Sequence, residues 1–79
     1  MNNCDMLPLS KLSIGEEAKL INVQGGHGIK QRLSVLGLNP GVRITMIQNG
    51  SWGPVILGVM DSRIALGRGM AKNIFVTRD

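Results

Sequence analysis

One stretch constrains the fold of this 79-residue chain more than any other: residues 32–41, which read Arg-Leu-Ser-Val-Leu-Gly-Leu-Asn-Pro-Gly. Apolar residues lead into it at helical spacing and form a single stripe, which predicts a short helix. The positions in the stripe are Ile29, Leu33 and Leu36. Because the rest of the chain is rich in strand-forming residues, the sequence predicts one helix inside a mainly β protein.

The predicted helix is followed by two stop signals. Gly37 is placed to take the left-handed conformation of a C′ residue, and Leu38 can then fold back onto the last helical turn. Pro40 and Gly41 fit the two central positions of a type II turn, the second of which needs a positive φ. We therefore assign Gly37, Pro40 and Gly41 to a structural turn that leads into the next strand.

Five short strands are predicted around this helix. They cover residues 17–24, 42–48, 55–60, 63–66 and 73–77. The alternation of the first strand slips between Leu20 and Ile21, which predicts a β-bulge or a tightly curved strand. Five short strands in so short a chain favour a small, curved barrel, and SH3-like and OB-like barrels are the two alternatives.

The chain is predicted to be one domain, residues 7–79, preceded by a flexible tail over residues 1–6. Leu9 and Leu12 lie one helical turn apart, and Gly15 ends that turn. The single cysteine excludes an internal disulfide, which is typical of a reducing compartment. The sequence shows neither a signal peptide nor an apolar run long enough to span a membrane, so we expect a cytoplasmic protein that does not itself cross the membrane.

Charge is unevenly distributed along the chain, whose formal net charge is +4. Between Ala18 and Arg78 there is one acid, Asp61, against eight basic residues. Such a surface favours an acidic partner, although scattered basic residues on a small domain also serve solubility. Nucleic acid is not expected as a partner, because Trp52 and Phe75 are the chain's two aromatic residues and do not make a stacking platform.

The sequence contains no recognisable catalytic arrangement. Glu16 and Glu17 are adjacent at the start of a strand, where successive side chains diverge. The loop over residues 25–28 lacks the spacing of nucleotide-binding motifs. A structural zinc site needs four ligands, usually in paired spacings, so Cys4 and His27 are weak metal candidates. We predict a non-enzymatic protein with no cofactor and at most weak binding of Fe²⁺ or Zn²⁺.

The outward face of the strands offers a candidate docking surface. Its apolar residues are Ile47, Ile56, Met60 and Phe75, and the basic residues around them are Arg43, Arg63 and Lys72. An apolar patch with a basic rim is typical of protein-docking sites. The alternative is that a barrel this small buries parts of both strand faces beneath its helix.

Several short motifs follow one another along nearly the whole chain. They are Leu9-x-x-Leu12-x-x-Gly15-x-x-Ala18, Arg32-Leu33-x-x-Leu36-Gly37-Leu38-x-Pro40-Gly41, Gly53-Pro54, Ile64-Ala65-Leu66 and Ala71-x-x-Ile74-x-Val76. Their order resembles the FeoA family of small cytoplasmic proteins of bacterial ferrous iron uptake, and residues 33–41 are the most specific part. The loop over residues 49–54 departs from the family pattern by carrying Trp52, either as a contact residue or as a lid on the barrel end.

The resemblance implies an SH3-like β-barrel of about five strands with a short α-helix inserted after the first strand. It also implies an accessory role beside FeoB, the membrane ferrous iron permease, by docking on or regulating its cytosolic GTP-binding part at the inner face of the membrane. The alternative is a transition-metal-binding iron chaperone or sensor. We expect partner contacts on the helix, its following turn and the basic strand faces, with these candidates: Arg32, Leu33, Leu36, Leu38, Arg43 and Arg63.

Overall fold

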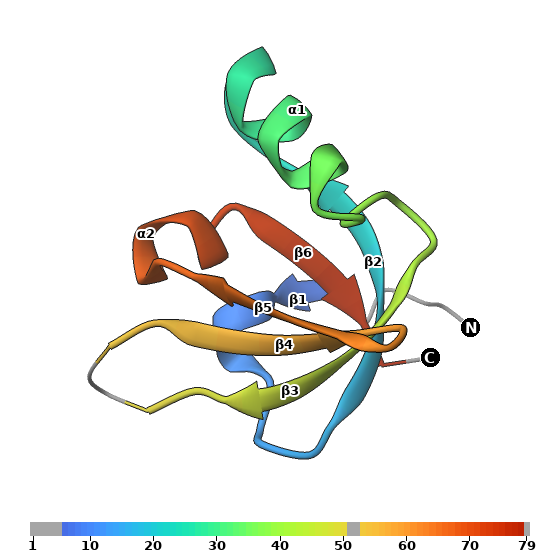
Figure 1. Cartoon of the computed structure of the whole chain (residues 1–79), viewed down its shortest axis with the longest axis vertical. Coiled ribbons are helices and arrows are strands. Elements are labelled where there is room, and N and C mark those ends of the chain that lie inside the picture. The colour runs from blue at the N-terminus through green and yellow to red at the C-terminus, as the bar shows by residue number, and fades with distance from the viewer. Residues whose placement is uncertain (1–5, 51–52, 79) are drawn as a thin grey trace.

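The protein, described here by a computed structural model over residues 6–50 and 53–78, contains six strands and three short helices in that part of the chain (Figure 1). They are β1 (Met6–Pro8), η1 (Leu9–Lys11, a 3₁₀ turn), β2 (Glu17–Val23), α1 (His27–Val35), β3 (Arg43–Gln48), β4 (Val55–Val59), β5 (Ser62–Leu66), α2 (Arg68–Ala71) and β6 (Ile74–Thr77). Cys4 and Trp52 lie outside the described residues. The mainly β fold with a short helix matches the prediction.

The strand that the sequence analysis misses is β1. It pairs antiparallel with β6, with Met6 opposite Thr77 and Pro8 opposite Phe75. Three residues that end in proline show no alternation, so nothing local marks them as a strand. Met6 therefore belongs to the sheet rather than to a tail, and α1 follows the second strand rather than the first.

The strands form one antiparallel sheet in the order β1-β6-β2-β3-β4-β5. Figure 1 shows that this sheet is strongly curved, with α1 projecting from one end of it. The two edge strands lead directly into short helices, β1 into η1 and β5 into α2, and η1 contacts α2. The two short helices thus connect the edges of the sheet around a common core.

Two irregularities bend the sheet. The register of β2 against β6 shifts between Leu20 and Asn22, which makes Ile21 the extra residue of a bulge, as the slipped alternation predicts. A second shift lies between Met46 and Gln48 in the pairing of β3 with β4. Because bulges increase the local twist, they help short strands to curve around a small core.

The core collects the inward residues of β2 through β6 together with leucines from η1, α1 and the turn after α1. Its fully buried larger side chains are Leu9, Leu12, Leu20, Leu33, Leu38, Ile44, Met46, Val55, Leu57, Ile74 and Val76. Within the described residues no polar or charged side chain is buried. Burying one such leucine contributes roughly 1.5–3 kcal/mol, so η1 and α1 are held mainly by the few leucines that they contribute.

The end of α1 has the geometry that residues 37–41 predict. The N–H of Leu38 donates to the carbonyl of Leu33 at 2.9 Å, and the N–H of Gly37 donates to that of Ser34 at 2.9 Å, which is a Schellman motif. Gly37 has a φ of 93° and Gly41 a φ of 96°. Because the N–H of Gly41 also donates to the carbonyl of Leu20 at 2.7 Å, the turn fixes the end of α1 against β2.

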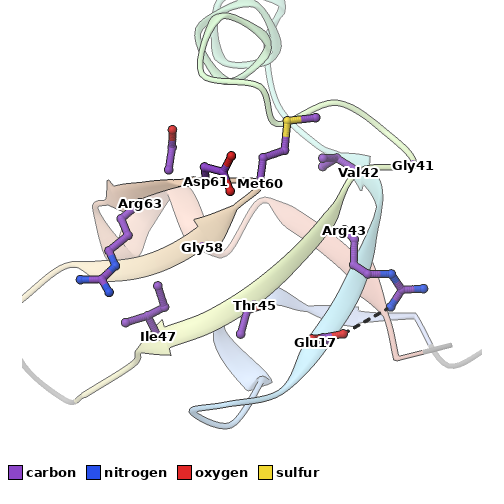
Figure 2. A pocket seen from close by; sticks show the side chains of 11 residues that line it. Glu17, Gly41, Val42, Arg43, Thr45, Ile47, Gly58, Met60, Asp61 and Arg63 are labelled. Atoms are coloured by element: carbon purple, nitrogen blue, oxygen red, sulfur yellow. Dashed lines mark ion pairs between the residues drawn. The ribbon is translucent and has the colours of Figure 1, made fainter.

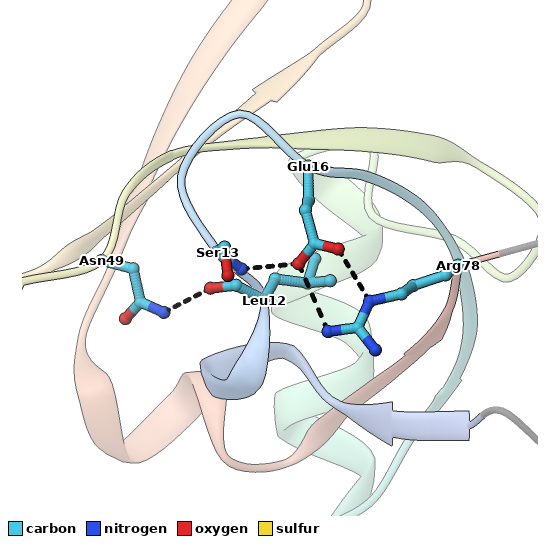
Figure 3. A network of polar contacts seen from close by, with 5 residues as sticks. All are labelled: Leu12, Ser13, Glu16, Asn49 and Arg78. Carbon is cyan, nitrogen blue, oxygen red and sulfur yellow. Dashed lines mark hydrogen bonds and ion pairs between the residues drawn. The ribbon is translucent and has the colours of Figure 1, made fainter.

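The opposite end of the molecule is held by polar side chains (Figure 3). The Oε1 atom of Glu16 accepts a 2.7 Å hydrogen bond from the N–H of Ser13, and its Oε2 accepts one of 2.7 Å from Nε of Arg78. The Nδ2 atom of Asn49 donates to the carbonyls of Ser10 and Leu12 at 2.9 and 2.8 Å. These bonds tie the segments around η1 to β3 and to the end of β6.

Candidate docking surface

Two hollows on the surface bring together most of the exposed residues that the sequence analysis names. The first, here called the sheet groove, has a volume of about 720 Å³ and crosses the outer faces of β3, β4 and β5. The second, here called the helix groove, has a volume of about 420 Å³ and lies between α1 on one side and β5 with α2 on the other. Both are open hollows in which a partner's side chain has room to lie.

The sheet groove has an apolar floor and charged ends (Figure 2). A Cβ atom on Gly58 would lie 3.2 Å from Cδ1 of Ile47, so the absence of a side chain there lets Ile47 lie across β4. Met60 stands at the rim with 90% of its surface exposed. Arg43 and Arg63 stand at opposite sides of the groove in Figure 2.

The charges of the sheet groove largely balance. Its lining includes two arginines and two acids, Glu17 and Asp61. Arg43 lies 3.9 Å from Glu17, and both side chains are more than half exposed, so this ion pair contributes at most about 1 kcal/mol. The sheet groove therefore gives little preference for the charge of a partner.

The helix groove is more apolar, and among the described residues the one charged residue in its lining is basic, Arg32. Arg32, Val35 and Leu36 form its wall on the α1 side, with Leu33 beneath them. Val35 is 82% exposed and Leu36 is 47% exposed. The opposite wall consists of Ala65, Leu66, Gly67 and Met70. Exposed apolar side chains beside a groove are a feature of docking surfaces.

The candidate residues divide between the two grooves. Arg32, Leu33 and Leu36 line the helix groove, whereas the two strand arginines, Arg43 and Arg63, line the sheet groove. Leu33 and Leu38 are buried, because they are the two ends of the Schellman hydrophobic contact. They shape the surface without being available to touch a partner, while a docking role for the other four stays a prediction.

The predicted outward apolar patch is partly assembled. Ile47 and Met60 both line the sheet groove, as do the two arginines, but Ile56, Phe75 and Lys72 do not line it. The sequence analysis does not name Val35 as a docking residue, because Val35 falls beside the helical stripe of Leu33 and Leu36. An apolar residue off the buried stripe of a short helix is the signal that could have identified it.

The described residues hold no assembled metal site. No group of three or more His, Cys, Asp or Glu side chains within residues 6–50 and 53–78 could hold a metal ion. His27 is the exposed first residue of α1, and Cys4 lies outside the described part. No helix in the described ranges is long and apolar enough to cross a membrane.

The FeoA domain family model matches residues 7–78, which is almost the whole chain. The chain belongs to the FeoA domain family. A curated relative from Methanocaldococcus jannaschii, named "Putative Fe(2+) transport protein A", is 41% identical over 71 residues, covering 90% of this chain and 85% of the relative. The match confirms the resemblance read from the order of the sequence motifs.

Two solved FeoA structures have the same fold as this chain. A crystal structure of an iron uptake regulatory protein (FeoA) superposes with a TM-score of 0.86 at 35% identity, covering 91% of this chain and 96% of that one. The FeoA of Stenotrophomonas maltophilia, solved in complex with zinc and described as a procaryotic SH3 domain protein, gives a TM-score of 0.77 at 31% identity, covering 89% and 88%. The SH3-like character expected of the sheet agrees with that description.

Proposed function

We propose that this FeoA-family protein is a non-enzymatic accessory protein of ferrous iron uptake that acts in the cytoplasm. It docks on the cytosolic GTP-binding part of the FeoB permease. The observation that carries the proposal is the helix groove, where Val35 and Leu36 are exposed on a helix that a backbone cap holds rigidly. Membership in a family with an Fe(2+) transport relative supplies the biological setting.

The physical argument rests on what an exposed apolar helix end costs a free protein. Val35 and Leu36 contribute little to the core, yet they expose apolar surface to water. Covering that surface with a partner releases about 25 cal/mol for each Å² of apolar area. Since the turn at Gly37 and Gly41 fixes the helix end, little conformational freedom is lost on docking.

An NMR titration of the ¹⁵N-labelled full chain with the soluble GTP-binding region of the permease tests the proposal, with GDP and with a GTP analogue. We expect shifts clustered on α1 and residues 36–41, and a Val35→Glu variant that binds about tenfold more weakly. Ile14→Glu is the matched control, because Ile14 is also an exposed aliphatic residue, 65% exposed, on the turn before β2. Equal loss in both variants, or no shifts at millimolar concentration, contradicts docking through α1.

A second candidate, direct binding of a transition metal, is favoured by one observation, the zinc in the Stenotrophomonas maltophilia relative. In this chain the candidates remain Cys4 and His27, and our prediction remains that no cofactor is resident. Anaerobic titration of Fe²⁺ and Zn²⁺ into the full chain and into a Cys4→Ser, His27→Ala variant tests the metal-binding role. Tight binding that the double substitution abolishes would support the metal role, and unchanged weak binding would remove it.

A further inference from the structure

We propose that the free edge of β5 accepts an extended, acidic segment of a partner protein as an added strand, with apolar side chains of that segment lying in the helix groove. This names the kind of segment that the docking role proposed above would use, and it rests on that role for the partner's identity. Three observations carry it: an unpaired strand edge, an apolar wall beside that edge, and an excess of basic over acidic side chains around it.

The edge of β5 presents backbone groups without partners. β4 and β5 are joined by the two-residue turn of Met60 and Asp61, and Val59 pairs with Ser62 to close it. Such turns are closed by a hydrogen-bonded pair, and hydrogen-bonded pairs then alternate with non-bonded ones along an antiparallel ladder. Arg63 and Ala65 therefore occupy the non-bonded pairs, with their N–H and C=O groups directed away from β4.

Nothing within residues 6–50 and 53–78 occupies those four groups. No hydrogen bond of Arg63 or Ala65 to a partner beyond the β4 ladder is found there. Unpaired N–H and C=O groups on an edge strand form a template for another extended chain. The other edge, β1, is less suited to this, because it has three residues and ends at Pro8.

The helix groove begins where the β5 edge ends. Ala65, Leu66 and Gly67 line the groove on the strand side, while Val35 and Leu36 line it on the α1 side. A strand added to β5 would run about 4.8 Å from it, between the edge and α1. Alternate side chains of that strand would point to one face, so apolar residues at every second position would reach the exposed leucine and valine.

The charges around this edge select an acidic segment. Arg32 lines the helix groove, Arg63 lies on β5 and Lys72 follows α2, whereas the turn before β5 carries one acid, Asp61. Arg68 of α2 is turned toward the η1 end, where its Nη2 donates to Oδ1 of Asn49. The two ion pairs found in the described residues use Arg43 and Arg78 instead. Pairing two copies of this chain through β5 would bring Arg63 beside the same basic surface, and like charges across strands are destabilising. An acidic partner strand is therefore favoured over a second copy.

The first test uses a synthetic probe, the acetylated and amidated heptapeptide Glu-Val-Glu-Val-Glu-Val-Glu, added to the ¹⁵N-labelled full chain. We expect amide shifts over Arg63–Gly67 and at Val35 and Leu36. The matched peptide with lysine in place of glutamate should bind at least tenfold more weakly. Shifts confined to the sheet groove, or equal binding of the two peptides, would overturn the proposal.

The strand geometry is tested by removing one hydrogen bond at a time. Ala65→Pro deletes an N–H that faces the free edge, so the ladder with β4 is retained, and we expect the probe to bind at least tenfold more weakly. Ala65→Thr keeps the N–H and is the control that should bind like the parent.

A second version of the geometry test leaves the protein unchanged. Two N-methylated forms of the probe are compared, one methylated at its valines and the other at its glutamates. Only one set of backbone groups can face β5, so one form should bind and the other should not. Equal binding of both forms is incompatible with strand addition.

Comparison with the GTP-binding region of the permease separates this inference from the proposed function. If that region binds the parent and Ala65→Pro equally, docking stands and strand addition is wrong. If the acidic probe binds at β5 but the region shows no binding, strand addition stands and the permease is not the partner. Sedimentation that shows a dimer abolished by Ala65→Pro would identify a second copy as the occupant and overturn the acidic-segment assignment.

Discussion

The two ends of this small protein are held together by different forces. At the η1 end, Glu16 and Asn49 use side-chain hydrogen bonds to join segments that are far apart in the sequence. At the α1 end, Leu33 and a backbone cap hold the helix, while Val35 and Leu36 remain exposed. The first end uses its polar groups to stabilise its own fold. The second leaves apolar side chains and a strand edge available, which is what a partner needs.

The largest effect expected is at Leu33, the one fully buried residue of α1. Leu33→Ala should lower the free energy of unfolding by about 2–5 kcal/mol, because it leaves a cavity where the helix meets the core. Urea denaturation followed by circular dichroism measures this. Leu36→Ala is the control and should cost less than about 1 kcal/mol, since Leu36 is half exposed. Equal costs would show that α1 is not held through Leu33.

At the η1 end we expect Asn49 to have the role that Leu33 has at the α1 end, because its side chain holds neighbouring segments together. Asn49→Ala removes the donor that satisfies the carbonyls of Ser10 and Leu12, and we expect a loss of about 1–3 kcal/mol in unfolding free energy. Gln48→Ala serves as the control, because Gln48 makes one exposed 3.4 Å bond to Pro54. If the two variants unfold at the same urea concentration, the Asn49 side chain does not hold the η1 end together.

The next effect comes from two glycines of α1 and its cap. Gly37→Ala should cost about 1–2 kcal/mol, because Gly37 has a φ of 93° in the left-handed region. Gly28→Ala should instead stabilise by roughly 0.5–1 kcal/mol, because Gly28 is helical and a Cβ there meets open space. Thermal unfolding of both variants measures the difference. Shifts of the same sign would contradict the assigned cap.

The smallest effect is the pH dependence of Glu16. The hydrogen bond from the Ser13 N–H, followed by that from Arg78, holds the pKa of Glu16 below its ordinary value of 4.5. Because the folded-state pKa is the lower one, the stabilisation is present above the unfolded-state pKa and is lost as pH falls through the folded-state pKa. Glu16→Gln should therefore flatten the fall in Tm between pH 5 and pH 3. Glu17→Gln is the matched control, and a parallel fall in both variants would contradict the role of Glu16.

The contrast between local and distant determinants explains how much the sequence could predict. The helix, its Gly37 cap and the turn at Gly41 depend on neighbours a few residues apart, so the local sequence pattern is enough to predict them. The bulge at Ile21 was visible for the same reason. β1 could not be predicted, because Met6–Pro8 becomes a strand only by pairing with β6, some seventy residues later in the chain.

The candidate site was less predictable than the fold. Helical spacing shows that Leu33 and Leu36 share a stripe, but the depth at which each lies depends on how far α1 projects from the sheet. The sequence likewise cannot show that β5 is an edge, since edge position follows from the order of all six strands. The residues chosen for docking therefore mixed anchors such as Leu38 with surface residues such as Arg32.

The pairing of β1 with β6 has a practical consequence for handling the molecule. Met6 lies opposite Thr77, so both described ends of the chain leave the sheet side by side, at the end of β6 that lies away from α2. A tether attached beyond either end would therefore orient the protein in the same way on a sensor surface. The same adjacency would allow a short linker to join the two ends and new ones to be opened in the exposed Met60–Asp61 turn.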